Sequence, residues 1–105
     1  MNVQEFDTMV RHDLPVVAII NNNGGWTGGS NETPGRSLGF AQRYHDVVTA
    51  LGGHGELVTE PGEIRPAIER AFASGKPSCV NVHADEHARA TTVPFGGYST
   101  MMQRE

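Results

Sequence analysis

The sequence has few of the features that mark secreted or membrane-spanning proteins. It contains one cysteine, Cys79, which excludes an internal disulfide and lies in an apolar run where we expect it to be buried. No run approaches the roughly 20 apolar residues that cross a bilayer, and residues 1–11 lack the apolar core of a signal peptide. These absences predict a cytoplasmic protein with no membrane partner.

Positive charge is also scarce. Eight Lys and Arg residues stand against twelve Asp and Glu residues, the formal net charge is -4, and the basic residues are dispersed along the chain. Surfaces that bind nucleic-acid backbones concentrate basic side chains, so we expect no nucleic-acid partner. The length of 105 residues, with 37% hydrophobic and 19% charged residues, suits one globular domain.

The most informative segment is an apolar run that ends in asparagine and glycine. Residues 14–20 are uncharged and include four β-branched residues, which predicts a parallel strand buried on both faces. The run is followed by Asn21, Asn22, Asn23, Gly24, Gly25 and Trp26. Open α/β sheets bind ligands beyond the carboxyl ends of their strands, so we expect a cation or phosphate site in the loop 21–39.

Hydrophobic periodicity predicts three helices, over residues 1–12, 40–51 and 61–75. We expect the third helix to open near Pro61 and to begin irregularly, because Pro66 removes one hydrogen bond early in it. Apolar runs predict two further strands, over residues 56–59 and 78–83. Helices between strands indicate right-handed parallel crossovers, so the expected fold class is α/β.

The histidines offer a competing metal hypothesis. Residues 83–87 read His-Ala-Asp-Glu-His, which matches the H-x-x-E-H signature of a class of zinc peptidases. That signature requires a helix, whereas here it follows a predicted strand, so we expect a solvated turn and rank a zinc hydrolase last. We expect His12 and His45 on solvent-facing helix positions, and His54 in an exposed turn.

Several segments, taken in order, resemble the C-terminal cofactor domain of thiamine-diphosphate-dependent enzymes. The matching segments are residues 2–11, 22–26, 50–56, 64–67, 73–77 and 80–82. The family contains acetolactate synthase, 2-hydroxyacyl-CoA lyase and oxalyl-CoA decarboxylase. The resemblance implies a partial thiamine-diphosphate-binding fold over residues 1–87, with three layers around a small parallel sheet.

The resemblance also implies a cofactor site in the turn after the first strand. The family motif is Gly-Asp-Gly, a helix, a strand and Asn-Asn, and only its second half is present. By position, the Asn23 side-chain oxygen and the Gly25 carbonyl would hold a Mg²⁺ ion that bridges the diphosphate, beside Asn22, Gly24 and Trp26. Mg²⁺ prefers such hard oxygen ligands. Without the aspartate of the motif, we expect weak or no cofactor affinity in the isolated chain.

The activity implied by the resemblance is carbon–carbon bond making or breaking next to the carbonyl of a 2-keto or 2-hydroxyacyl substrate, CoA esters included. The cofactor carries this chemistry, and the family's activating glutamate lies on a separate pyrimidine-binding domain. The resemblance therefore implies no catalytic residue in this chain, and a dimer or a partner subunit that supplies that domain.

Two questions stay open in the sequence. Residues 88–105 would resemble a closing lid with Tyr98 and Ser99 as substrate contacts, or they form a frayed terminus. The alternative function is a non-catalytic fragment that self-associates, or pairs with another chain, through an open sheet edge.

Overall fold

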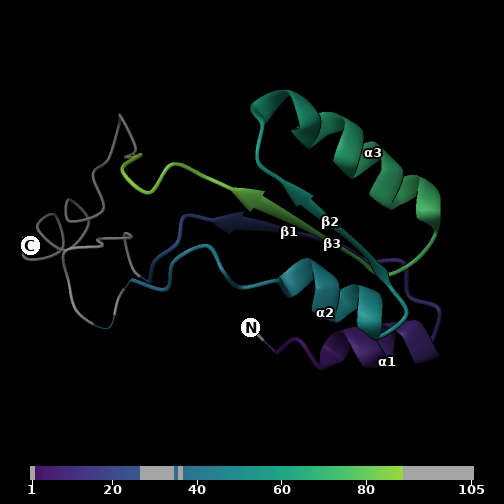
Figure 1. The fold of residues 1–105 in the computed structure, drawn as a ribbon. Helices are drawn as coiled ribbons and strands as arrows, with labels where there is room; N and C mark the ends of the chain where they lie inside the picture. The colour runs from purple at the N-terminus through teal and green to yellow at the C-terminus, as the bar shows by residue number, and fades with distance from the viewer. Residues whose placement is uncertain (1, 27–34, 36, 89–105) are drawn as a thin grey trace, which may run out of the picture.

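The computed structural model describes residues 2–26, 35 and 37–88. Its elements, in chain order, are α1 (Glu5–Arg11), β1 (Val17–Asn22), α2 (Tyr44–Ala50), β2 (His54–Val58), the 3-10 turn η1 (Pro61–Glu63), α3 (Ile64–Ser74) and β3 (Ser78–His83). The strands form one parallel sheet in the order β1-β3-β2. The last strand in the sequence therefore lies in the middle of the sheet (Figure 1).

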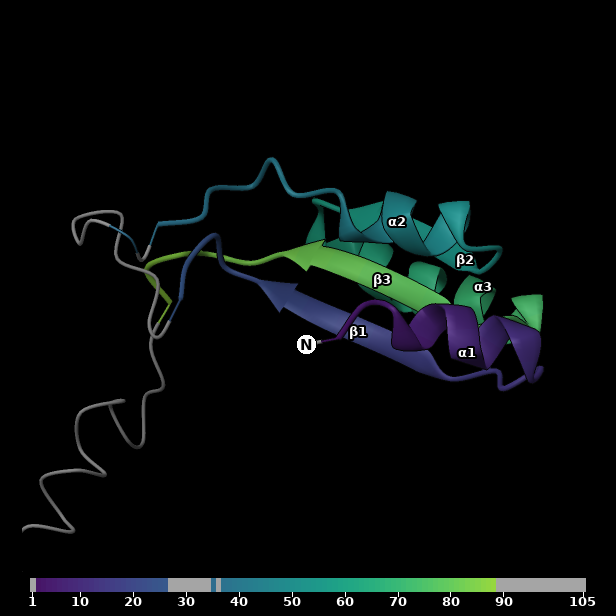
Figure 2. The ribbon, with the colours of Figure 1, turned by 90° about the horizontal axis from the view of Figure 1, so that it is seen from below.

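The domain has three layers. Helices α1 and α2 cover one face of the sheet and α3 covers the other (Figure 2). Side chains of β3 alternate between the two faces, as a pleated strand requires: Cys79 packs with Phe6 and Val48, whereas Val80 packs with Val58 and the alanines of α3. These layers confirm the predicted α/β fold class.

The third helix and the last strand agree closely with the sequence. Pro61 opens a 3-10 turn that leads into α3, which confirms the irregular start, and Gly75 ends the helix in the left-handed conformation at φ 66°. β3 has the predicted bounds. In the described part of the chain, no helix has the length and apolar character needed to cross a membrane.

Two helices begin later than predicted. Asn2 Oδ1 accepts a hydrogen bond from the Gln4 N–H (3.2 Å), which holds residues 2–4 in a turn, so α1 starts at Glu5. α2 starts at Tyr44, because Phe40 packs its ring against His83 instead, with ring centroids 4.7 Å apart. In both cases a specific contact replaced the first helical turn.

The outer strands correct three further predictions. β1 starts at Val17 and includes Asn21 and Asn22, because its pairing with β3 continues until Asn22 lies opposite His83. β1 is an edge strand and is not buried on both faces: Ile19 keeps 51% of its surface exposed. β2 starts two residues earlier than predicted, at His54.

Candidate functional site

The carboxyl ends of the three parallel strands meet at one edge of the sheet (Figure 1). At this edge the chain leaves β1 in a turn that is held by backbone contacts. The N–H groups of Leu38 and Gly39 both donate to the Gly24 carbonyl, at 2.8 and 2.9 Å. Gly25 forms an isolated antiparallel bridge with Ser37. The returning loop therefore fixes the turn on the sheet edge.

Glycine is required at position 24 for two reasons. Its φ of 71° lies in the left-handed region, which residues with a side chain rarely adopt. An added Cβ would also lie 3.1 Å from two atoms of the Phe40 ring. The geometry of the turn thus accounts for the glycine at position 24.

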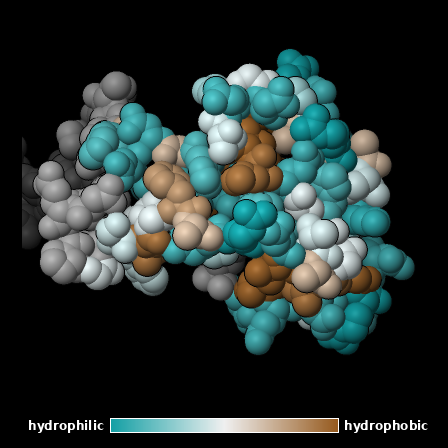
Figure 3. Space-filling view, viewed as in Figure 1, coloured by the Kyte–Doolittle hydropathy of each residue, from teal (hydrophilic) through white to brown (hydrophobic). Residues whose placement is uncertain are grey.

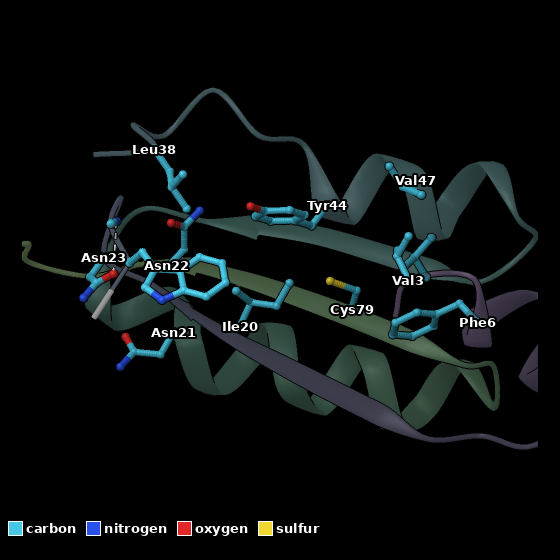
Figure 4. Close-up of a pocket in the computed structure, with 13 residues that line it drawn as sticks. Val3, Phe6, Ile20, Asn21, Asn22, Asn23, Leu38, Tyr44, Val47 and Cys79 are labelled. Carbon is cyan, nitrogen blue, oxygen red and sulfur yellow. Dashed lines mark hydrogen bonds between the residues drawn. The ribbon is translucent and has the colours of Figure 1, made fainter. Parts of the chain in front are cut away.

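A pocket of about 660 Å³ opens beside the turn. Its walls are mostly apolar, and its lining residues are Val3, Phe6, Ile20, Asn21, Asn22, Asn23, Gly25, Trp26, Leu38, Tyr44, Val47, Val48 and Cys79. Figure 4 shows Tyr44 and Val47 of α2 on the opposite side of the pocket from Ile20 and Cys79 of the sheet. Amide side chains gather at one end, so the pocket joins a polar mouth to an apolar interior.

The three asparagines have different environments. Asn22 is buried, and both ends of its amide are used: Oδ1 accepts from the Gly24 N–H (3.0 Å) and Nδ2 donates to Asn81 Oδ1 (3.2 Å). Asn23 is half-buried, and among the residues that the structure describes its Oδ1 accepts the Gly25 N–H (3.2 Å) and no other donor. A carbonyl oxygen has two lone pairs, so Asn23 retains acceptor capacity toward a ligand. Asn21 is exposed.

The structure brings most of the predicted site residues together. Asn22, Asn23, Gly25 and Trp26 all line the pocket, and Trp26 leaves 65% of its surface exposed at this site. Gly24 is buried and shapes the turn without lining the pocket. The predicted substrate contacts Tyr98 and Ser99 lie outside the described residues.

Sequence reasoning missed a buried polar cluster behind the turn. His45 was expected to face solvent, but it is buried, and its Nδ1 lies 3.3 Å from Asn81 Nδ2. Two signals could have located it. His45 lies three residues before the core residue Val48, on the same side of the helix. Asn81 interrupts an apolar strand, and a buried amide needs hydrogen-bond partners.

Of the expectations for His12 and His54, the first is confirmed and the second is wrong. His12 is exposed, as expected. His54 is not in an exposed turn: it opens β2, and its Nε2 lies 2.7 Å from Glu56 Oε2. The expectation is wrong because β2 begins at His54 and so includes the residues of the expected turn.

Cys79 lines the pocket as a neutral group. It is buried, as predicted, and burial raises the pKa of its thiol to about 11. Only the thiolate is a strong nucleophile or metal ligand. The sheet-side wall of the pocket is therefore uncharged at neutral pH.

The zinc hypothesis is wrong for the described residues. The chain from His83 to His87 is the end of β3 followed by a turn, not the helix that the signature requires, and the His87 side chain is 74% exposed. Within residues 2–26, 35 and 37–88, no group of three or more His, Cys, Asp or Glu side chains could hold a metal ion. The expected post-strand turn is confirmed.

Comparison with known proteins agrees with this geometry. Residues 1–82 match the family model described as thiamine pyrophosphate enzyme, C-terminal TPP binding domain. An acetolactate synthase large subunit from Mycobacterium tuberculosis is 52% identical over 90 residues, which cover 77% of this chain and 16% of that protein. A 2-hydroxyacyl-CoA lyase from Oryza sativa is 36% identical over 101 residues, covering 85% of this chain and 18% of that protein.

An oxalyl-CoA decarboxylase from Escherichia coli is 35% identical over 92 residues, which cover 80% of this chain and 16% of that enzyme. The chain thus spans less than a fifth of the length of these three relatives. The family match extends over the three-layered domain and the turn that follows β1. This chain belongs to the thiamine pyrophosphate enzyme family, as a C-terminal TPP binding domain.

Proposed function

We propose that the chain binds the diphosphate end of thiamine diphosphate (thiamine pyrophosphate) through a Mg²⁺ ion at the turn after β1. The observation that carries the proposal is the fixed turn itself, in which Asn23 and Gly25 face the same pocket. The Asn23 side-chain oxygen and the Gly25 carbonyl would be the two protein ligands. Asn22 would act by holding the turn, because it is buried and its amide already links Gly24 to Asn81.

The two proposed ligands, the Asn23 side-chain oxygen and the Gly25 carbonyl oxygen, are of the chemical type that Mg²⁺ prefers. The ion prefers oxygen ligands in near-octahedral order and usually retains phosphates and waters in its shell. Two neutral oxygens leave room for two diphosphate oxygens, and they carry no charge to balance the ion. A carboxylate from another part of the enzyme would complete the shell, since the described residues hold no cluster of acidic side chains suited to a metal.

The pocket suits the rest of the cofactor. Its polar end lies at the turn, its walls are mostly apolar, and the Cys79 thiol in its sheet-side wall is neutral. Organic cofactors bind in such pockets, where a few polar groups orient an otherwise apolar surface. When bound, thiamine diphosphate supplies the electron sink for carbon–carbon chemistry. The residues of this chain would bind and orient it.

The proposed parent activity is carbon–carbon bond making or breaking beside a carbonyl, on 2-keto or 2-hydroxyacyl substrates that include CoA esters. It is supported by the names of the three relatives, a synthase, a lyase and a decarboxylase. Their greater length supports a pyrimidine-binding domain from elsewhere, in a homo-oligomer or a partner subunit. A cytoplasmic location and a lid over residues 88–105 remain predictions from the sequence.

Isothermal titration calorimetry of the whole chain tests the cofactor proposal. We expect weak heat at millimolar thiamine diphosphate that requires Mg²⁺. Asn23→Ala should abolish this Mg²⁺-dependent heat, whereas Asn21→Ala should not, because Asn21 is an exposed amide at the pocket that is not one of the proposed ligands. The absence of Mg²⁺-dependent heat in the wild-type chain would contradict the proposal, as would equal effects of the two substitutions.

A second candidate function is association through the free edge of the sheet. The Ser78 and Ala84 N–H groups donate to the carbonyls of Val16 and Asn22, respectively. In a parallel ladder every second residue of a strand bonds to its neighbour, so the even-numbered residues of β1 face β3 and the backbone groups of Ile19 point away from it. None of the described strands lies beyond β1. β1 carries no charged side chain, and such an uncharged edge pairs readily with another strand.

A further inference from the structure

The side chain of Asn81 links the candidate site to the interior of the domain. Asn81 is fully buried in the central strand, on the face covered by α2. Its Oδ1 accepts from Asn22 Nδ2 at 3.2 Å. Its Nδ2 lies 3.3 Å from His45 Nδ1 and 3.5 Å from the Gln42 carbonyl oxygen. A continuous chain of hydrogen bonds therefore runs from His45 to Asn22.

Backbone groups at the two ends fix the direction of every bond in this chain. The Gly24 N–H can only donate, so the Asn22 atom that faces it is Oδ1 and the Asn22 atom that faces Asn81 is Nδ2. Asn81 then presents its Oδ1 to Asn22. Its Nδ2 faces the Gln42 carbonyl, which can only accept, and His45 Nδ1. His45 Nδ1 must therefore carry a lone pair.

The other ring nitrogen of His45 agrees with this assignment. Nε2 lies 3.6 Å from Asp46 Oδ1, on the side of the ring away from Asn81. A proton on Nε2 faces a carboxylate there, and that carboxylate also pairs with Arg43. The partner of one imidazole nitrogen sets which nitrogen carries the proton. The neutral Nε2–H tautomer satisfies both contacts.

We propose that His45 is a positioning residue for the candidate cofactor site. Through Asn81 and Asn22 it holds the Gly24 amide in place, and with it the two proposed ligand oxygens on either side. The identity of the ligand rests on the function proposed above, whereas the coupling from His45 to the turn rests on the contacts alone. The bonds that join His45, Asn81, Asn22 and Gly24 are all buried, so water cannot replace a lost partner without opening the turn.

Amide hydrogen exchange in the whole chain, followed by NMR without cofactor, tests the coupling. The Gly24 N–H is protected by Asn22 Oδ1. In His45→Leu, which removes the acceptor, we expect at least tenfold faster exchange at Gly24, relative to amides of β3. In His45→Asn, whose side-chain oxygen can take the place of Nδ1, we expect protection to return.

Ser78→Ala is the matched control. Ser78 is fully buried at the opposite end of β3 and donates to the Lys76 carbonyl at 2.8 Å. The Ser78→Ala substitution should lower the stability of the domain, but it should not speed exchange at the Gly24 amide relative to the amides of β3. Equal selective exchange at Gly24 in Ser78→Ala and His45→Leu would overturn the proposal. So would unchanged exchange in His45→Leu.

Two further measurements distinguish a failure of the His45 positioning role from a failure of the proposed cofactor binding. In the wild-type chain, imidazole ¹⁵N shifts should show the Nε2–H tautomer of His45 at neutral pH, and a proton on Nδ1 would overturn the proposal even if His45→Leu fails to fold. Titration of the same samples with Mg²⁺ and thiamine diphosphate tests the ligand. Coupling without binding would contradict only the proposed function. Binding by the wild type that His45→Leu matches in affinity would contradict the positioning role.

Discussion

Gly55 in β2 occupies a place where no side chain fits. An added Cβ would lie 1.9 Å from the His45 carbonyl oxygen and 2.5 Å from Thr49 Oγ1. Gly55→Ala therefore forces α2 away from β2, and we expect a loss of about 3 kcal/mol in the free energy of unfolding. Chemical denaturation measures this loss. Gly62→Ala, where an added Cβ meets nothing within 4 Å, is the control, and similar losses in the two variants would contradict the packing of α2 on β2.

Cys79 offers a test of burial at the pocket wall. Because burial raises the pKa of its thiol to about 11, little thiolate exists at pH 8 in the folded chain. We expect a disulfide reagent to react roughly 100-fold more slowly with the native chain than with the chain in denaturant. Absorbance of the released thiol follows both rates. Similar rates in both conditions would show that Cys79 is exposed.

The residues of the turn were predictable from the sequence, but the residues behind it were not. Asn23 and Gly25 stand out because a polar run follows an apolar strand and because the family motif fixes their positions. The role of His45 depends on Asn81, which is 36 residues away in the sequence. Helical periodicity places His45 only relative to its own helix, so it could not show this partner.

At the scale of elements, Glu56 connects β2 to α3. Its Oε1 accepts from Arg70 Nε and Nη2 at 3.0 and 2.8 Å, and its Oε2 lies 2.7 Å from His54 Nε2. Burial raises the pKa of Glu56, but the hydrogen bonds from Arg70 and His54 lower it by more, so the net shift is downward. A lowered pKa in the folded state means that ionised Glu56 stabilises the fold, and that this contribution is lost as the pH falls through that pKa.

Glu56→Gln should therefore be less stable than the wild type at pH 7, and the gap should close below about pH 4. Denaturation curves at both pH values measure the gap. Glu69→Gln is the control, because Glu69 pairs within α3 with Arg65, whose side chain is largely exposed, and such pairs contribute little. A gap for Glu56→Gln that is the same at every pH would contradict an ionised role for Glu56.

Element boundaries were predictable where local chemistry determines them. Pro61 and Gly75 set the limits of α3 through their own backbone preferences. The predicted bounds of β1 were wrong, because the limits of this strand follow from its pairing with β3. The strand extends into asparagines, which have low intrinsic strand propensity. The sequence also could not show that β1 lies at the edge, since an apolar run looks the same in an edge strand and a central one.

At the scale of the whole molecule, the exposed large apolar residues come from several helices, strands and loops. The space-filling view shows separate hydrophobic patches between hydrophilic side chains (Figure 3). Two of the most exposed large apolar residues are Ile19 on β1 and Phe72 on α3, with 51% and 67% of their surfaces exposed. Of these two, only Ile19 also lies on a strand whose backbone is free to pair. Substitutions at Ile19 and Phe72 can therefore distinguish association through the edge of β1 from general hydrophobic association.

Ile19→Lys should weaken self-association, because a charged side chain on an edge strand disfavours pairing with a second copy. The free energy of unfolding should change by less than about 1 kcal/mol, since the side chain is half exposed. Sedimentation velocity over a range of concentrations measures the association. Phe72→Lys is the matched control, and an equal or larger effect of that substitution would show that the edge of β1 is not the interface.

The strand order β1-β3-β2 also governs the timing of folding during synthesis. β1 and β2 do not pair with each other, and each pairs with β3, which the ribosome makes after both of them. Until residues 78–83 leave the exit tunnel, the described strands cannot assemble into this sheet. Assembly then closes contacts over long sequence separations in one step, which is slow relative to local folding. The apolar run of β1 therefore stays without its β3 partner at least until residues 78–83 have emerged, and chaperones that bind extended hydrophobic segments would find it there.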